Sequence, residues 1–386
     1  MGVNMSNLII FEVKKFFNRK KNIFCIALFL LLVTIFIFLN SNLEKQYKKS
    51  QVTSIEFQID SLEESLSKVE NEILRLPDNE KLQVIKNDYQ EELDLLKDTK
   101  VSLVNNDFNK VLENKIKLDD LLLKGIEEGN TISSTSVQEI EESKQINNYL
   151  IENNIEPIFE QVSMQGINFV KLFLNNPISI ILIILVIILS SDVMSSEFDS
   201  NTYKLLFIQP ISRKKILLSK VLATIIIINI IIFTIIGAIF AILGIINGFG
   251  DINYPIKFYN NGTTELIGIG KFILLELVII GVINIFICVL SLAISSLNKS
   301  TSNSIAVMMI TTIGAYMISS SGLVNKIAHL NPFAYFNISS LLQGDLTILY
   351  NNYNVSFKFA LLIIPIITII ILIINIIIIE RKCNFK

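Results

Sequence analysis

Few side chains in this 386-residue sequence have the type and spacing that catalysis requires. The only histidine, His329, cannot supply a metal site made of several histidines. No glycine-rich loop of the GxxxxGK[ST] kind is present, so the chain is not expected to bind and hydrolyse ATP by that route. No apolar block holds paired aspartates or an HExxH helix. We therefore predict that the chain is not an enzyme and binds no metal or cofactor directly.

A small set of polar side chains lies inside long apolar blocks. Glu276 is a carboxylate in such a block, where an ionised group is costly and marks a candidate substrate or gating residue. It also lies near one end of its block, so pairing with Lys271 or with headgroup water is the alternative. Asn229, Asn284 and Asn375 are further polar points inside predicted spans. They either line the substrate pathway or form hydrogen bonds between helices.

A different polar segment follows the second apolar block, from residue 195 to residue 220. It combines an acidic start, a short helix with an apolar face, a proline that breaks this helix, a serine that can cap the next one, and a basic run. An apolar helix exposed at a membrane surface is costly unless it lies on lipid or docks a partner. The residues concerned are Glu197, Thr202, Leu205, Leu206, Ile208, Pro210, Ser212, Arg213, Lys214 and Lys215.

Hydrophobic residues make up 51% of the chain and occur in long uncharged blocks. Because a bilayer core about 30 Å thick needs about 20 apolar residues in a helix, we predict an all-α membrane protein with six transmembrane helices. The predicted spans are residues 23–39, 178–194, 221–246, 272–297, 305–322 and 359–379. A secretory signal peptide is the alternative for the first block, but no small-residue cleavage site follows it.

The basic residues orient these spans, because loops rich in Lys and Arg stay in the cytoplasm. Residues 1–22, which form a predicted amphipathic interfacial helix, contain five of them, and the 195–220 loop contains five more. Both termini are therefore expected in the cytoplasm of a cell membrane. The bias towards Ile, Asn and Lys suggests a bacterial source. The net charge of −2 implies no nucleic-acid partner.

Residues 40–172 differ in character from the rest and form the predicted extracellular domain. Between residues 40 and 171 there are 15 Lys and Arg but 26 Asp and Glu, a net charge of −11. None of the three cysteines falls here, so no disulfide framework stabilises the domain. The spacing of apolar residues from Val52 to Leu76 alternates between three and four, which predicts a coiled-coil helix, and the Pro77 region ends it. A solvated spacer without a binding role is the alternative to a functional domain.

The sequence as a whole resembles the permease subunits of type-2, or type V, ATP-binding-cassette (ABC) exporters. An amphipathic elbow helix precedes the first span, matching residues 7–21. A motif of the form acidic-x-x-x-Gly-Thr, leucines and Pro-x-Ser-Arg follows the second span, with Asn201 in place of the usual glycine. An Asn-Pro-x-x-Tyr stretch precedes the last span. The matching motif residues are Glu197, Thr202, Leu205, Leu206, Pro210, Ser212, Arg213, Asn331, Pro332 and Tyr335. A large insert between the first two spans also occurs in one branch of that family.

The resemblance implies a transmembrane domain over residues 173–386 and a permease that a separate cytoplasmic ATPase subunit drives, with ATP and Mg²⁺ bound by that partner. The 195–220 loop would be the ATPase-coupling loop, although a loop kept only for topology is the alternative. Two identical or related permeases would form the pathway within the lipid bilayer. The exported substrate would be hydrophobic, lipid-like or a peptide, including an antimicrobial peptide. A non-transporting sensor or structural tether that uses the coiled coil is the rival function.

Overall fold

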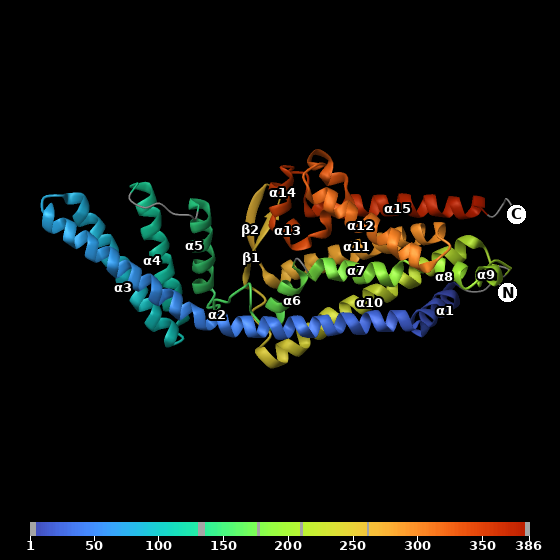
Figure 1. Ribbon diagram of the computed structural model, residues 1–386, viewed down its shortest axis with the longest axis horizontal. Helices are drawn as coiled ribbons and strands as arrows, with labels where there is room; N and C mark the ends of the chain where they lie inside the picture. The colour runs from blue at the N-terminus through green and yellow to red at the C-terminus, as the bar shows by residue number, and fades with distance from the viewer. Residues whose placement is uncertain (1–4, 130–135, 176–177, 209–210, 261, 383–386) are drawn as a thin grey trace. The chain divides into compact units, whose positions relative to one another are not determined.

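The computed structural model describes residues 5–129, 136–175, 178–208, 211–260 and 262–382 (Figure 1). The chain divides into two compact units. Unit 1 contains residues 1–37, 165–252 and 256–386, and unit 2 contains residues 38–164 and 253–255. Each unit has its own core, so each is described by itself.

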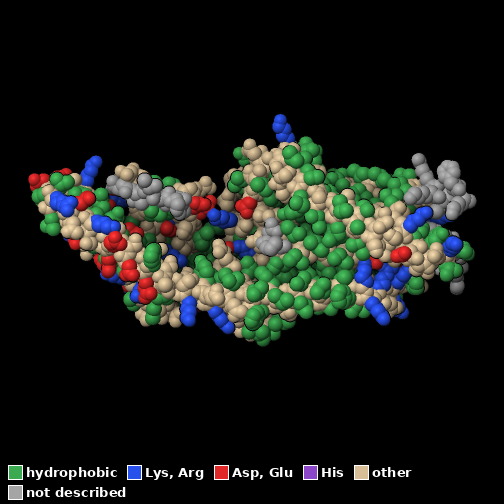
Figure 2. All heavy atoms as spheres, viewed as in Figure 1, with side chains coloured by type: hydrophobic (Ala, Val, Ile, Leu, Met, Phe, Trp, Pro, Cys, Tyr) green, Lys and Arg blue, Asp and Glu red, His purple; other side chains and the backbone are tan. Residues whose placement is uncertain are grey.

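Unit 1 is built mainly from long apolar helices, and the described residues of the chain contain six helices that are long and apolar enough to cross a membrane. This confirms the predicted class, an all-α membrane protein with six spans. Figure 2 shows hydrophobic side chains over much of the visible face of this unit. The candidate spans lie in α2 (Lys20–Arg75), in α7 (Ile178–Ser190) with α8 (Ser195–Asp199), in α10 (Arg213–Asn247), in α11 (Ile269–Leu297), in α12 (Thr301–Ser320) and in α15 (Phe357–Lys382).

The first of these helices is much longer than the span predicted within it. α2 contains 56 residues and continues without interruption past residue 39. No glycine or proline occurs between Asn40 and Gln51, so nothing in the sequence stops the helix there. α1 (Met5–Asn18) precedes α2 and corresponds to the predicted amphipathic elbow helix.

Several shorter elements of unit 1 have no counterpart in the sequence analysis. A two-stranded sheet is formed by β1 (Pro255–Asn260) and β2 (Thr263–Gly268). The others are α6 (Gly166–Leu174), η1 (Asn325–Leu330), η2 (Pro332–Phe336), α13 (Ile338–Gln343) and α14 (Asp345–Tyr350). In contrast, α9 (Tyr203–Ile208) corresponds to the short helix with an apolar face that was predicted within residues 195–220. We call the end of unit 1 that contains α1, α8 and α9 the elbow end, and the end that contains β1 and β2 the hairpin end (Figure 1).

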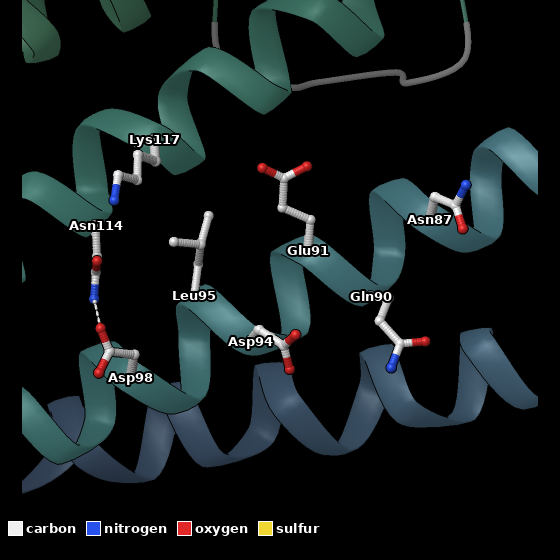
Figure 3. A pocket seen from close by; sticks show the side chains of 8 residues that line it. All are labelled: Asn87, Gln90, Glu91, Asp94, Leu95, Asp98, Asn114 and Lys117. Carbon is white, nitrogen blue, oxygen red and sulfur yellow. Dashed lines mark hydrogen bonds between the residues drawn. The ribbon is translucent and has the colours of Figure 1, made fainter.

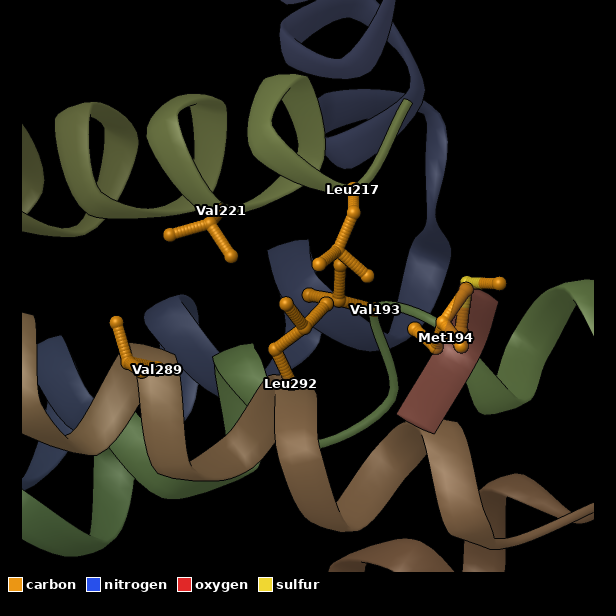
Figure 4. Packing of buried hydrophobic residues seen from close by; sticks show 7 residues of the cluster. Val193, Met194, Leu217, Val221, Val289 and Leu292 are labelled. Atoms are coloured by element: carbon orange, nitrogen blue, oxygen red, sulfur yellow. The ribbon is translucent and has the colours of Figure 1, made fainter. Parts of the chain in front are cut away.

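A hydrophobic cluster holds the helices together at the elbow end (Figure 4). It joins the end of α7, the start of α10, the last part of α11 and α15, and none of its members is more than 9% exposed. Because the cluster includes the residues just before α8, it gives that helix a rigid base. Its members are Val193, Met194, Leu217, Val221, Val289, Leu292 and Ile379.

Unit 2 is a helical assembly in which α2 and α3 (Glu80–Val104) are antiparallel. Three ion pairs show the direction, because the residue number rises along α2 as it falls along α3: Glu56–Lys100 at 2.8 Å, Glu63–Lys97 at 2.7 Å and Glu70–Lys86 at 2.8 Å. Between them, Ile59 packs against Leu93 and Leu96. α4 (Phe108–Glu127) packs on α3, and α5 (Val137–Glu152) packs on α4.

A polar groove lies between α3 and α4 (Figure 3). Its volume is about 550 Å³, and its lining includes Glu91, Asp94 and Asp98. Asp98 already has partners, since it accepts hydrogen bonds from Asn114 at 2.9 Å and from Lys110 at 2.7 Å. These bonds hold the pKa of Asp98 below its ordinary value, with Lys110 the largest cause. The groove is therefore part of the interaction between the two helices.

The core of unit 2 provides a direct test of its packing. Leu112 in α4 is 1% exposed, whereas Val104 at the end of α3 is 63% exposed. Leu112→Ala is expected to destabilise unit 2 by about 2–5 kcal/mol, because it leaves a cavity. Val104→Ala is expected to have little effect. Hydrogen exchange of the α4 and α5 amides in the full chain measures both, and equal exchange in the two variants would contradict the packing described here.

Candidate functional site

The segment from residue 195 to residue 220, the coupling segment, folds as α8, α9 and the start of α10. Asn201 joins α8 to α9 with a φ of +56°. This left-handed conformation suits Gly and Asn, which explains the residue found at this motif position. Ser212 occupies the N-cap position of α10 as predicted, but its side chain makes no capping hydrogen bond. Pro210 and the side chain of Leu206 lie outside the described part of the chain.

Glu197 of α8 is buried, with only 1% of its surface exposed. Its Oε1 accepts a hydrogen bond from Lys220 Nζ at 2.7 Å and another from Lys15 Nζ. Its Oε2 accepts a hydrogen bond from Thr202 Oγ1 at 2.5 Å. The motif residues Glu197 and Thr202 therefore bond to each other, and Glu197 also bonds to basic residues of α1 and α10. In this conformation Glu197 is not available to contact a second protein.

Lys220 connects this carboxylate to α1. The residue is completely buried, and its Nζ also donates to Glu12 Oε1 at 2.7 Å. One ammonium group thus joins α8, α10 and α1. A buried charge is tolerated only when it is paired and hydrogen-bonded, and two carboxylates meet that condition here.

Asp192 forms a second ionic group beside the first. It is 4% exposed and pairs with Arg19 at 3.3 Å and with Lys21 at 2.7 Å. Arg19 also donates to Ser196 Oγ at 2.6 Å. The sequence analysis did not single out Asp192, although an aspartate within a predicted span, 178–194, was an available signal.

These residues form what we call the elbow cluster. It consists of Glu12, Lys15, Arg19, Lys21, Asp192, Glu197 and Lys220, together with the hydroxyl groups of Ser196 and Thr202. The pairs connect α1 and the start of α2 to α8 and α10. Removing one member of a buried pair leaves the other charge uncompensated, at a cost of about 3–5 kcal/mol. The cluster therefore fixes the position of α8 relative to α1 and α10.

The outer face of the coupling segment is exposed and mixed in character. Leu205 and Ile208 on α9 are 69% and 79% exposed. Exposed polar and basic residues lie on α9 and at the start of α10: Lys204, Ser212, Lys214 and Lys215. Exposed apolar side chains rimmed by charges are typical of a protein interface. Arg213 is only partly exposed.

Glu276 lies at the other end of unit 1, towards the hairpin end of α11, and is completely buried. Its Oε1 accepts a hydrogen bond from Ser339 Oγ of α13. The alternative of pairing with Lys271 is wrong for this conformation, because Lys271 is exposed and the contact of Glu276 is with Ser339. The sequence analysis missed Ser339 because it expected no helix between the fifth and sixth spans.

The asparagines inside the spans bond to neighbouring helices. Asn284 Nδ2 donates to Asn229 Oδ1 at 3.2 Å, which connects α11 to α10. Asn375 Oδ1 accepts a hydrogen bond from Ser296 Oγ at 3.0 Å, which connects α15 to α11. Interhelical hydrogen bonding is thus present at all three positions.

The comparison with protein families decides the class of the chain. Residues 6–374 match the family described as ABC-2 family transporter protein. The chain belongs to this family. No curated protein and no solved structure gave a match. The matched residues include almost all of α1, the coupling segment and α11, so the elbow cluster and Glu276 both lie within the matched range.

As an ABC-2 family member, the chain is the multi-pass membrane permease component of an ABC transporter. Permeases of this family are transport components that are generally not catalytic themselves, and they associate in general with an ABC ATPase subunit. The elbow cluster and the exposed face of α9 are the features of this permease that bear on such an association.

Proposed function

We propose that this permease exports a hydrophobic, lipid-like or peptide substrate and is driven by a separate ATPase that docks on the coupling segment. Two identical or related copies form the pathway, and ATP and Mg²⁺ are bound by the partner subunit. Both termini lie in the cytoplasm of a bacterial cell, and unit 2, with its antiparallel coiled coil, lies outside. The elbow end is then the cytoplasmic end.

The observation that carries the proposal is the contrast between the two faces of the coupling segment. Its inner face is bound to α1 and α10 through Glu197, and its outer face exposes Leu205 and Ile208. A partner that pushes on the outer face therefore meets a rigid base and moves α1 and α10 with it. This is the arrangement that transmission of force from an ATPase requires.

Charge reversal on the exposed face tests the docking. Arg213→Glu combined with Lys214→Glu is expected to leave membrane insertion intact but to reduce coupled ATPase activity at least tenfold, because the basic rim of the surface is lost. Activity is measured in proteoliposomes that contain the permease and its ATPase. Lys326→Glu combined with Lys358→Glu, at the hairpin end, is the matched control. Normal activity of the Arg213 and Lys214 variant would refute docking at this segment.

The charge of residues 40–171 bears on the substrate. A net charge of −11 attracts cationic molecules, so a cationic antimicrobial peptide suits this domain better than an anionic lipid does. The permease would then confer resistance to such peptides. Salt-dependent binding of a cationic peptide to the full chain supports this substrate class, and binding that is insensitive to salt counts against it.

A second candidate function is a non-transporting sensor or tether. It is favoured by the length of α2, a helix of 56 residues that contains both a candidate membrane span and the residues of the predicted coiled coil. Substrate movement in proteoliposomes distinguishes the two functions, because a sensor would change ATPase activity when its ligand binds but would move nothing across the bilayer.

A further inference from the structure

The five basic residues near the start of the chain separate into two groups in the structure. Lys15, Arg19 and Lys21 are partly buried and pair with Glu197 or Asp192. The remaining two residues, Lys14 and Lys20, are exposed, and neither forms an ion pair within the described ranges. In the sequence analysis all five residues counted equally, because the rule that orients membrane spans counts every Lys and Arg in a loop.

The two exposed lysines lie among exposed aromatic residues. Phe11 is 58% exposed and Phe17 is 48% exposed on α1, and Phe24 is 67% exposed at the start of α2. Phe11, Lys14 and Phe17 are spaced by three residues, so they lie on one face of α1. Figure 2 shows Lys and Arg side chains gathered at one end of unit 1.

We propose that this outward face of the elbow, formed by Phe11, Lys14, Phe17, Lys20 and Phe24, is a binding surface for the anionic headgroups of membrane lipids. The phenyl rings enter the boundary between headgroups and acyl chains, and the two ammonium groups contact phosphates. The candidate span of α2 begins within this face, and α1 packs on α10, another helix with a candidate span, which places the face at the surface of a bilayer.

A protein partner fits this face less well. The phenyl rings continue into the apolar surface of α2, where Ile23 and Leu28 are 54% and 48% exposed. A face that merges with a membrane-spanning surface meets lipid on the same side. The occupant is therefore a lipid headgroup.

The position of this face gives lipid binding a consequence for the permease. On its other side the same short stretch of chain carries Lys15, Arg19 and Lys21, which pair with Glu197 of α8 and with Asp192 in the turn before it. Lipid that holds the elbow against the bilayer thus also holds the base of the coupling segment. Anionic lipid is therefore expected to stabilise the elbow end, and this effect does not depend on which protein docks there.

The test uses the purified full-length permease in nanodiscs of phosphatidylcholine with increasing phosphatidylglycerol. The melting temperature of the wild-type protein is expected to rise with phosphatidylglycerol. The double variant Lys14→Gln, Lys20→Gln is expected to need at least tenfold more phosphatidylglycerol for the same rise in melting temperature. The double variant Lys14→Arg, Lys20→Arg keeps both charges and is expected to behave as wild type. Lys81→Gln with Lys117→Gln removes the same charge from unit 2 and is the matched control.

Three results would overturn the proposal. The first is a wild-type melting temperature that does not respond to phosphatidylglycerol. The second is an equal loss of response in the Lys81 and Lys117 control, which would indicate a general charge effect. The third is the same stabilisation by soluble glycerol phosphate in phosphatidylcholine nanodiscs, which would indicate a free-phosphate site. Because no ATPase is present, failure here is separate from failure of the proposed docking.

Discussion

Lys220→Met is expected to be one of the most damaging single substitutions in the chain. It removes the buried ammonium group that joins Glu197 and Glu12, so both carboxylates lose a partner in a region of low dielectric constant. The expected cost is about 3–5 kcal/mol of stability. Thermal unfolding of the detergent-solubilised protein measures it, and coupled ATPase activity is expected to fall as α8 loses its fixed position.

The controls for this prediction come from the same helix and the same cluster. Lys215→Met removes an exposed lysine of α10 and is expected to change stability by less than about 0.5 kcal/mol. Lys220→Met combined with Glu197→Gln is expected to recover part of the loss, because the uncompensated charge is removed together with its partner. If Lys220→Met and Lys215→Met unfold at the same temperature, the elbow cluster does not hold α1, α8 and α10 together.

Glu276 is the second position at which a large effect is expected. Glu276→Ala removes the acceptor of the Ser339 hydrogen bond from a completely buried position. A loss of about 1–3 kcal/mol is expected, because the buried Ser339 hydroxyl group is left without its acceptor. Transport is expected to fall at least tenfold, because α13 is no longer held on α11 at the hairpin end.

A conservative substitution separates the structural effect from a gating role of Glu276. Glu276→Gln keeps an oxygen that can accept the Ser339 hydrogen bond and is expected to keep much of the stability. If the carboxyl group of Glu276 takes part in gating, transport in proteoliposomes stays low in this stable variant. Wild-type stability and transport in Glu276→Gln would show that Glu276 serves only to hold Ser339. Ser339→Ala is expected to have an intermediate effect, since it removes one hydrogen bond and no charge.

The sequence was sufficient to predict the spanning helices, because the length of an apolar block is a direct consequence of bilayer thickness. It also singled out residues 195–220 as one unit, and Glu197 and Thr202 within this segment prove to be in contact. The direction in which these side chains point was not predictable. Glu197 pairs with Lys15 and Lys220, which are 182 and 23 residues away in the chain, and no local pattern encodes such distant pairs.

The elements that were missed share a physical cause. β1 and β2 are six residues each, and α13 and α14 are also six residues each. Segments this short carry little periodicity, and their conformation depends on packing against α11 and its neighbours. Lys14 and Lys15 show the same limit at the level of single residues, because adjacent positions on a helix differ by about 100° in direction. One of the two faces out and the other pairs with Glu197.

The backbone of Asn201 restricts how this part of the family can vary. A residue with a φ of +56° sets the angle at which α9 leaves α8, and a side chain branched at Cβ would cost about 1–2 kcal/mol there. Glycine and asparagine are therefore interchangeable at this position, whereas valine or isoleucine would redirect α9 and with it Leu205 and Ile208. Replacement of Asn by Gly at this position among homologues is expected to leave the direction of α9 unchanged. A β-branched residue there would indicate a permease whose α9 leaves α8 at a different angle.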